Sequence, residues 1–256
     1  MSLQACAELV ERGDRDRFLA TMAAPPAARA VLFPLYAFNL EVARAPWVAS
    51  EPMIAEMRLQ FWRDVVEEIG QGATPRAHEV VQPLADAVRG ADAGLLDALI
   101  AARRWDVYRD AFEDAAHFER YIDATSGNLA WVAARALGAE ATAEAPLRDM
   151  AHAAGVASLL RAVPELEARG RVPLLDGRPE GVRALADRAL ARLKRGKAGQ
   201  GAIAKPARPA VFAFWRAEAA LKAARAEPAR VAGGTLDESE FARRGRLLRV
   251  SLTGRV

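Results

Sequence analysis

Cysteine is nearly absent from this sequence: Cys6 is the single example among 256 residues. One cysteine excludes internal disulfide bonds and zinc sites built from cysteines, and it is typical of proteins in a reducing compartment. The sequence also lacks the run of about 18 apolar residues that a helix needs to cross a bilayer. Its first residues do not have the basic start and apolar stretch of a signal peptide. We therefore expect a cytoplasmic protein, which could still contact a membrane at its cytoplasmic face.

A strong net charge is absent as well. Lysine and arginine number 36 and aspartate and glutamate 33, so that the formal net charge is only +3. Binding to nucleic acid depends on many cations that neutralise phosphates. A surplus this small does not indicate such a partner, and we expect no nucleic acid to bind.

Alternating apolar and polar residues, the mark of a half-buried strand, are missing throughout. Apolar residues recur instead at helical spacing, first over residues 31–47 and again over 52–69. We predict an all-α protein with one domain over residues 1–256 and roughly eight to ten helices. We further expect an N-terminal extension, a flexible basic loop and a basic C-terminal segment, which cover residues 1–13, 194–209 and 236–256.

Carboxylates cluster on one predicted helix, where Asp64, Glu67 and Glu68 stand three and four residues apart. This spacing could hold Mg²⁺ against a diphosphate, but a solvated helix face has the same pattern and is the favoured interpretation. The last segment alternates arginines with Phe241, Leu247 and Leu248. Such a basic amphipathic helix can lie on an anionic membrane or cover the core of its own protein, and the sequence leaves both open.

Several motifs, in order along the chain, together resemble those of the squalene/phytoene synthase superfamily, whose members are all-α prenyltransferases. They are Asp16-Arg17-Phe18, Leu35-Tyr36-Ala37-Phe38, the block from Arg58 to Asp64, the segment from Tyr121 to Gly127, and the stretch from Gly155 to Pro173. The resemblance covers residues 14 to 175 and implies a single isoprenoid-synthase-like helical bundle around a central cavity.

The resemblance also implies two Asp-rich motifs on facing helices that hold Mg²⁺ and the diphosphates of two prenyl substrates. Aligned on Tyr36-Ala37-Phe38, the first motif falls on Ala43, Arg44, Ala45, Pro46 and Trp47, none of which is acidic. In the second motif, counted from Arg161 to Gly170-Arg171, the acidic positions fall on Ala162, Glu165 and Leu166, so that only Glu165 remains.

These losses bear directly on catalysis. One charge–charge contact at ~4 Å contributes about 4 kcal/mol at an effective dielectric constant of ~20. Losing several metal-mediated contacts costs on the order of 10 kcal/mol, roughly seven decades in rate. We expect ordinary synthase activity to be absent and no catalytic residue or metal cofactor to be in place.

The pattern is most similar to a divergent branch of the superfamily that includes the mitochondrial complex I assembly factor with a synthase-like fold. The resemblance then implies a non-catalytic role near a membrane, with a respiratory-complex subunit as a partner and a prenyl or lipid ligand in the cavity. We predict that such a ligand is contacted by Tyr36, Arg44, Arg58, Trp62, Tyr121, Arg161 and Arg171.

An active transferase remains the alternative. It would condense two prenyl diphosphates with Mg²⁺ held by displaced carboxylates, for which the candidates are Asp64, Glu67, Glu68, Asp123 and Glu165. The two hypotheses differ in one observable: whether these five carboxylates meet at one cavity mouth. A helical scaffold with a filled interior and no ligand is the third hypothesis.

Overall fold

The computed structural model describes residues 3–48, 51–88, 92–108 and 110–256, and within them it contains helices and turns but no strand. The predicted all-α, single-domain fold is confirmed. The α-helices are α1 (Leu3–Gly13), α2 (Arg15–Met22), α3 (Pro26–Val48), α4 (Pro52–Gln71), α5 (Val81–Ala87), α6 (Ala93–Arg103), α7 (Ala115–Ile122), α8 (Asn128–Ala136), α9 (Glu144–Ala168), α10 (Pro179–Ala198), α11 (Ala217–Ala226), α12 (Ala229–Ala232) and α13 (Glu240–Thr253).

Shorter helical turns complete the chain. A π-helical turn, η3 (Asp123–Gly127), joins α7 to α8 without a break in direction. The remaining turns are 3-10 helices, namely η2 (Arg104–Asp106), η4 (Ala141–Ala143), η5 (Gln200–Ala202) and η6 (Lys205–Phe214).

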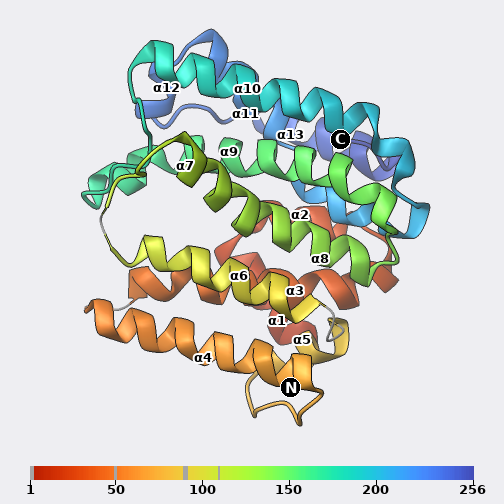
Figure 1. Cartoon of the computed structure of the whole chain (residues 1–256). Helices are drawn as coiled ribbons and strands as arrows, with labels where there is room; N and C mark the ends of the chain where they lie inside the picture. The colour runs from red at the N-terminus through yellow and green to blue at the C-terminus, as the bar shows by residue number, and fades with distance from the viewer. Residues whose placement is uncertain (1–2, 49–50, 89–91, 109) are drawn as a thin grey trace.

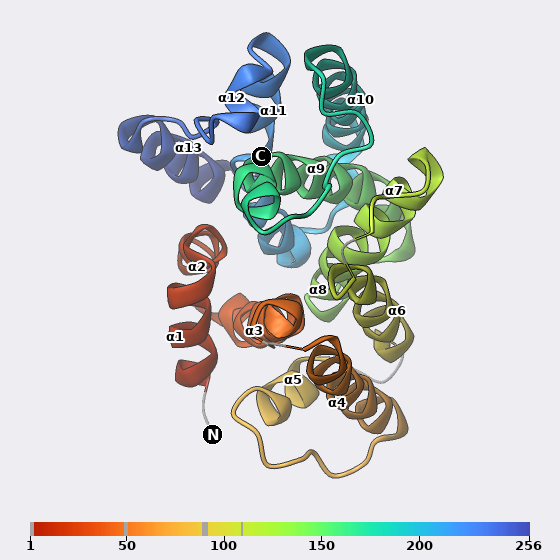
Figure 2. The ribbon, with the colours of Figure 1, turned by 90° about the vertical axis from the view of Figure 1, so that its left-hand side faces the viewer.

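Helix α3 lies near the middle of the bundle. It begins at Pro26, since proline suits the first turn of a helix, where its missing N–H is not needed. Viewed end-on in Figure 2, α3 has α1 and α2 on one side and α6 and α8 on the other, with α9 above it. Figure 1 shows α9 lying between α8 and α10. The helices α3 and α9 therefore face each other from the two halves of the molecule.

The predicted N-terminal extension is part of the core instead. Helix α1 packs along α3 and buries Cys6, Leu9 and Val10. Its last residue, Gly13, lies so close to Leu40 that a Cβ atom there would stand 2.2 Å from a Leu40 methyl carbon. Burial raises the pKa of the Cys6 thiol to about 11, so the thiol stays protonated at neutral pH. The chain uses residues 3–13 to cover the outer side of α3.

The prediction of a flexible loop over residues 194–209 is wrong. Helix α10 continues to Ala198, and η5 and η6 take up most of the rest. The glycine that suggested flexibility has a packing role, because a Cβ atom on Gly196 would stand 2.6 Å from the Pro146 carbonyl oxygen of α9. Glycine here allows α10 and α9 to approach closely.

The basic C-terminal segment forms α13, which has two different faces. Val250 is buried and Arg243 reaches inward, whereas Phe241, Leu248 and Leu252 are exposed. The segment therefore covers part of its own protein and also presents apolar side chains outward. Within the described residues, no helix combines the length and apolarity needed to cross a membrane.

Candidate functional site

A cavity of about 960 Å³ lies between the two halves of the bundle. Its walls come from α2, α3, α6, η2, α7, η3, α8, α9, η6, α11 and the start of α13, and its volume is at the upper end of the range for small-molecule sites. One part of the wall is apolar and includes Leu129, Ala130, Ala154, Ala157 and Phe214. The rest carries charged side chains from several helices, so the cavity suits a ligand with a polar head and an apolar body.

The six positions assigned to the lost motifs all line this cavity. Ala43, Arg44 and Trp47 project from α3, and Ala162, Glu165 and Leu166 project from α9. The two helices thus face each other across the cavity as expected, but the one carboxylate among the six, Glu165, is paired with Arg169 at 2.6 Å.

Arginine and tryptophan side chains stack at one end of the cavity, which we call the Trp47 end. The guanidinium of Arg169 lies 4.9 Å from the Trp47 ring centre, and that of Arg171 lies 5.6 Å from it and 4.8 Å from the Trp105 ring. Arg171 is only 5% exposed, and it donates hydrogen bonds to the carbonyl oxygens of Trp105 and Asp106. Cation–π contacts and carbonyl groups therefore hold its charge in place.

A buried hydrogen-bonded group adjoins this stack and belongs to the Trp47 end. The Tyr121 hydroxyl donates to Asp106, whose two carboxylate oxygens each lie 3.0 Å away, and Arg103 donates to the Tyr121 oxygen at 2.7 Å. Burial raises the pKa of Tyr121 well above its ordinary value, since the lowering effect of Arg103 is smaller and Asp106 raises the pKa again. The phenol remains protonated and serves as a hydrogen-bond donor.

The opposite end, the Asp16 end, is a network of ion pairs. Asp16 on α2 accepts hydrogen bonds from Arg161 and Arg243, each at 3.0 Å, and also from Arg216. Asp237 accepts from Arg161 at 3.0 Å and from Arg216 at 2.6 Å. Burial raises the pKa of Asp237, but the two arginines outweigh burial and hold this pKa below its ordinary value.

These lining residues do not fit a Mg²⁺ cluster. Mg²⁺ needs carboxylate oxygens that are free to coordinate it. Each of the five carboxylates that line the cavity already pairs with arginine, and they are spread over α2, η2, α9 and the segment before α13. The five are Asp14, Asp16, Asp106, Glu165 and Asp237.

The carboxylates proposed as displaced metal ligands do not meet at the cavity mouth. Of the five, only Glu165 lines the cavity. Asp64, Glu67 and Glu68 lie on α4, where Glu68 is paired with Arg76 at 2.6 Å. Asp123 belongs to a separate cluster. This separation counts against the active-transferase hypothesis in the form that the sequence suggested.

The residues predicted to contact a ligand fall into two groups, those at the cavity and those elsewhere. Tyr36, Arg44, Tyr121 and Arg161 line the cavity, and Arg171 lies just behind Trp47 and Trp105. Arg58 and Trp62 lie elsewhere, so a ligand in the cavity does not reach them. Arg58 is exposed on α4, and the buried Trp62 ring packs against Phe38 with ring centres 5.4 Å apart.

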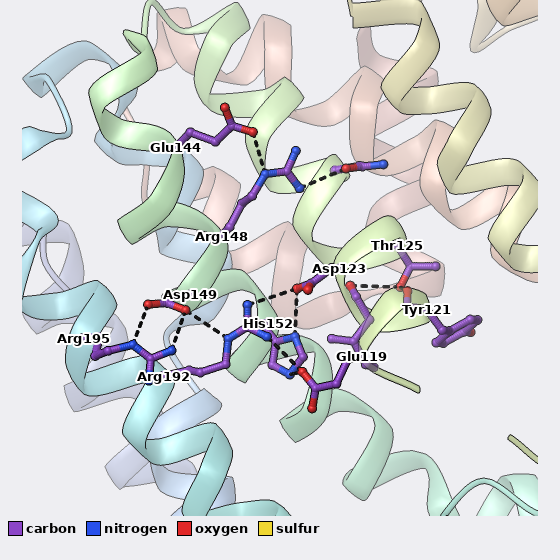
Figure 3. Close-up of polar contacts among 12 residues, drawn as sticks. Glu119, Tyr121, Asp123, Thr125, Glu144, Arg148, Asp149, His152, Arg192 and Arg195 are labelled. Carbon is purple, nitrogen blue, oxygen red and sulfur yellow. Dashed lines mark hydrogen bonds and ion pairs between the residues drawn. The ribbon is translucent and has the colours of Figure 1, made fainter. Parts of the chain in front are cut away.

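Sequence reasoning missed a polar cluster between α7, η3, α9 and α10, shown in Figure 3. His152 lies between Asp123, at 2.9 Å from Nδ1, and Glu119, at 3.1 Å from Nε2. These three could in principle bind a metal, but Arg192 donates to both carboxylates at 3.0 and 3.3 Å. A half-buried arginine inside the cluster disfavours a cation, and the arrangement fits a structural ion-pair network. The separation of 29 residues between Asp123 and His152 gave no signal in the sequence.

Comparison with known proteins agrees with the fold. The squalene/phytoene synthase family model matches residues 10–174, more than half of the chain. The structure is similar to that of a dehydrosqualene synthase, with a TM-score of 0.79, 15% identity, and coverage of 98% of this chain and 95% of that one. It is also similar to squalene synthase HpnC from Alicyclobacillus acidocaldarius, with a TM-score of 0.73, 18% identity, and coverage of 88% and 93%. At these identities the two structures support the fold alone.

The curated relatives that are similar in sequence are named as assembly factors, whereas the similar structures are named as synthases. The chain is 29% identical over 177 residues to the NADH dehydrogenase (ubiquinone) complex I, assembly factor 6 homolog of Drosophila melanogaster, covering 66% of this chain and 53% of that protein. It is 29% identical to complex I assembly factor 6 of Bos taurus and 28% identical to that of Homo sapiens, each over 170 residues, 65% of this chain and 51% of theirs. The chain thus spans about half the length of the curated relatives it matches.

Proposed function

Because the chain belongs to the squalene/phytoene synthase family, we propose that it is a non-catalytic member that acts in the assembly of respiratory complex I. In this role it holds a prenyl or lipid ligand in the central cavity and needs no metal cofactor. The family fold supplies the cavity, and the loss of the metal-binding residues converts a reaction chamber into a binding site.

One observation carries the proposal. The cavity wall has Ala43, Arg44 and Trp47 on α3 and Ala162 and Leu166 on α9, where the family resemblance implies Mg²⁺-binding carboxylates. Departure of a diphosphate needs stabilisation of its negative charge. Losing several metal contacts removes on the order of 10 kcal/mol of that stabilisation, which slows the reaction by roughly seven decades.

The names of the relatives support the assembly part of the proposal. Proteins from a fly, cattle and humans that share 28–29% identity with this chain are named as complex I assembly factor 6 or its homolog. They are longer than this chain, so their role is extended to it only as part of the proposal.

The catalytic part is tested by measuring pyrophosphate release from farnesyl diphosphate and geranylgeranyl diphosphate in the presence of Mg²⁺. We expect no release above the rate without protein, while an active squalene synthase in the same assay releases pyrophosphate readily. Sustained turnover by this chain, with a C–C-coupled product detected by mass spectrometry, would overturn the proposal.

The assembly part needs a cellular test. We expect a strain that lacks this protein to contain less fully assembled complex I on a native gel and to recover when the chain is restored. Native mass spectrometry of the purified protein is expected to retain a lipid or a respiratory subunit. Normal complex I assembly in the deletion strain contradicts the assembly role.

We also propose that α13 contacts an anionic membrane surface. Phe241, Leu248 and Leu252 project outward from this helix, and Arg244 and Arg249 are exposed on it as well. Exposed apolar side chains beside arginines are the features by which a helix lies on an anionic lipid surface. A protein that assists a membrane complex benefits from such attachment, and the prediction of a cytoplasmic-face location agrees with it.

A further inference from the structure

The two ends of the cavity differ in how completely their charges are paired. At the Asp16 end, each arginine of the cavity wall has a carboxylate partner: Asp16 or Asp237 for Arg161, Arg216 and Arg243, Asp14 for Arg17 and Glu11 for Arg15. At the Trp47 end, four arginines meet only two carboxylates. The arginines are Arg44, Arg103, Arg169 and Arg171, and the carboxylates are Asp106 and Glu165. Among the described residues, Arg44 at the Trp47 end is therefore an arginine of the cavity wall without a carboxylate partner, and the Asp16 end has none.

Among the described residues, the Trp47 end also has more buried hydrogen-bond donors than buried acceptors without a partner. Within the described residues, three buried side-chain N–H donors there have no partner, namely Arg103 Nε, Trp105 Nε1 and Arg171 Nε, whereas the Asp16 end has one, Arg243 Nε. No buried acceptor is left without a partner at this end among those residues. A buried donor without a partner destabilises the protein. Surplus donors together with an arginine that has no carboxylate partner favour a ligand that offers negatively charged acceptor oxygens.

Arg44 is placed to meet such a ligand without breaking another contact. It lines the cavity, is exposed, and forms no ion pair with any residue that the structure describes. It stands on α3 one turn before Trp47, whose ring faces Arg169 and Arg171. A planar guanidinium binds two phosphate oxygens at once. The cationic group is therefore assembled before any ligand arrives.

We propose that the Trp47 end binds the phosphate or diphosphate group of a single-chain amphiphile directly through arginines, without a divalent cation. The apolar chain lies along the wall formed by Leu129, Ala157 and Phe214. Arg44 is the principal contact, and Arg103 and Arg169 support it. This inference rests on the proposed non-catalytic function. A protein that only holds the anion needs arginines to bind it, and it needs no metal ion to help a diphosphate leave.

Isothermal titration calorimetry of the full chain tests the proposal with four probes, each in EDTA and in Mg²⁺. The probes are farnesyl diphosphate, a lysophosphatidic acid, inorganic diphosphate and farnesol. We expect at least one of the two phosphorylated amphiphiles to bind in EDTA, with Kd unchanged by Mg²⁺ within about twofold. The headgroup alone and the alcohol alone are expected to bind at least about tenfold more weakly, because each lacks one half of the recognised chemistry. Comparison of the two amphiphiles identifies whether the source is a prenyl diphosphate or a phospholipid.

A matched pair of variants locates the site. Arg44→Gln is expected to weaken binding in EDTA by roughly tenfold or more, since a charged hydrogen bond contributes about 1.5–3 kcal/mol. Arg58→Gln is the control, because Arg58 is also exposed and without an ion pair among the described residues but lies on α4 outside the cavity. We expect it to change Kd by less than about twofold. Both variants should keep the melting temperature of the wild type.

Three outcomes would overturn the proposal. They are no binding of either amphiphile, binding that requires Mg²⁺, and equal Kd for Arg44→Gln and wild type. Failure of the proposed function is a separate result, because it would appear as pyrophosphate release with Mg²⁺. Metal-dependent binding without turnover would refute the arginine site and leave the non-catalytic function intact.

Discussion

His152 is a buried residue that lies between two carboxylates. It is 2% exposed, and each ring nitrogen lies within about 3 Å of a carboxylate oxygen, Nδ1 of Asp123 and Nε2 of Glu119. Both nitrogens can donate only when the imidazole is protonated. Burial raises the pKa of Asp123, but hydrogen bonds from His152 and Arg192 outweigh burial and keep this pKa below its ordinary value. His152 thus joins α7, η3 and α9.

We predict that His152→Gln lowers the free energy of unfolding by about 1.5–3 kcal/mol, because one amide cannot serve both carboxylates and the loss of a hydrogen bond to a charged group is costly. Urea denaturation at neutral pH measures the change. The control is His117→Gln, since His117 lies near the start of α7, is partly exposed, and has only a long hydrogen bond of 3.4 Å from the Glu113 N–H and a carboxylate contact at 4.0 Å. That variant should stay within about 0.5 kcal/mol of wild type. Equal effects of the two substitutions would contradict the role given to His152.

The sequence could place a single residue when that residue and a recognisable family motif lie on the same helix. Ala43, Arg44 and Trp47 follow Tyr36 on the same helix, so helical spacing alone puts them on the cavity wall. Trp62 shows the limit. Its motif resembles that of the family, but which face of α4 points inward depends on packing against Phe38, which the sequence does not record.

The contact between η3 and α9 depends on the absence of a side chain. A Cβ atom on Gly155 would stand 2.5 Å from the Ser126 hydroxyl oxygen and 2.8 Å from a methyl carbon of Ile122. The π-helical turn, with one extra residue per turn, projects Ser126 toward α9. Both elements border the cavity, so this close approach sets the position of its wall.

We predict that Gly155→Val destabilises the fold by about 2–3 kcal/mol, because the added carbons overlap Ser126 and Ile122 in a packed region. Thermal and urea denaturation provide the measurement. Gly245→Val is a matched control in helix α13, where nothing lies within 4 Å of the added Cβ atom. It should change stability by no more than about 0.5 kcal/mol. A Gly155→Val protein as stable as this control would show that η3 and α9 are not tightly packed.

Elements were predictable where hydrophobic periodicity is strong and not where small residues have a packing role. Residues 31–47 and 52–69 were assigned to helices from periodicity, and α3 and α4 occupy them. The composition of residues 194–209 indicated a loop, because glycine, lysine and proline are typical of loops. Gly196 instead allows α10 to lie against Pro146 and Met150 of α9. A single sequence does not distinguish a glycine at a contact between two helices from a glycine in a loop.

At the scale of the whole molecule, α13 has a role on each of its faces. Its inner face supplies Arg243, which bonds to Asp16 of α2 and lines the cavity. Its outer face exposes Phe241 and Leu252, which are 88% and 77% accessible. The sequence was compatible with a segment that covers the protein and with one that contacts a membrane. The two roles do not exclude each other, because they use opposite faces of one helix. A membrane that binds the outer face would lie beside one wall of the cavity.

We predict that the protein binds vesicles of phosphatidylcholine and phosphatidylglycerol more strongly than vesicles of phosphatidylcholine alone, and that salt weakens the binding because it screens Arg244 and Arg249. Vesicle flotation measures the bound fraction. The double variant Phe241→Ser, Leu252→Ser should bind at least about tenfold more weakly, since burial of each apolar side chain contributes up to about 1.5–3 kcal/mol.

The control for this experiment carries the same chemical change on another helix. Met53 and Met57 of α4 are both 67% exposed, so Met53→Ser, Met57→Ser removes comparable apolar surface away from α13. We expect this variant to bind vesicles as the wild type does, within about twofold. Equal loss in the two double variants would mean that exposed apolar area in general drives binding, and would reject α13 as the membrane contact. Selective loss in the α13 variant supports a membrane-facing helix whose other side forms the wall of the ligand cavity.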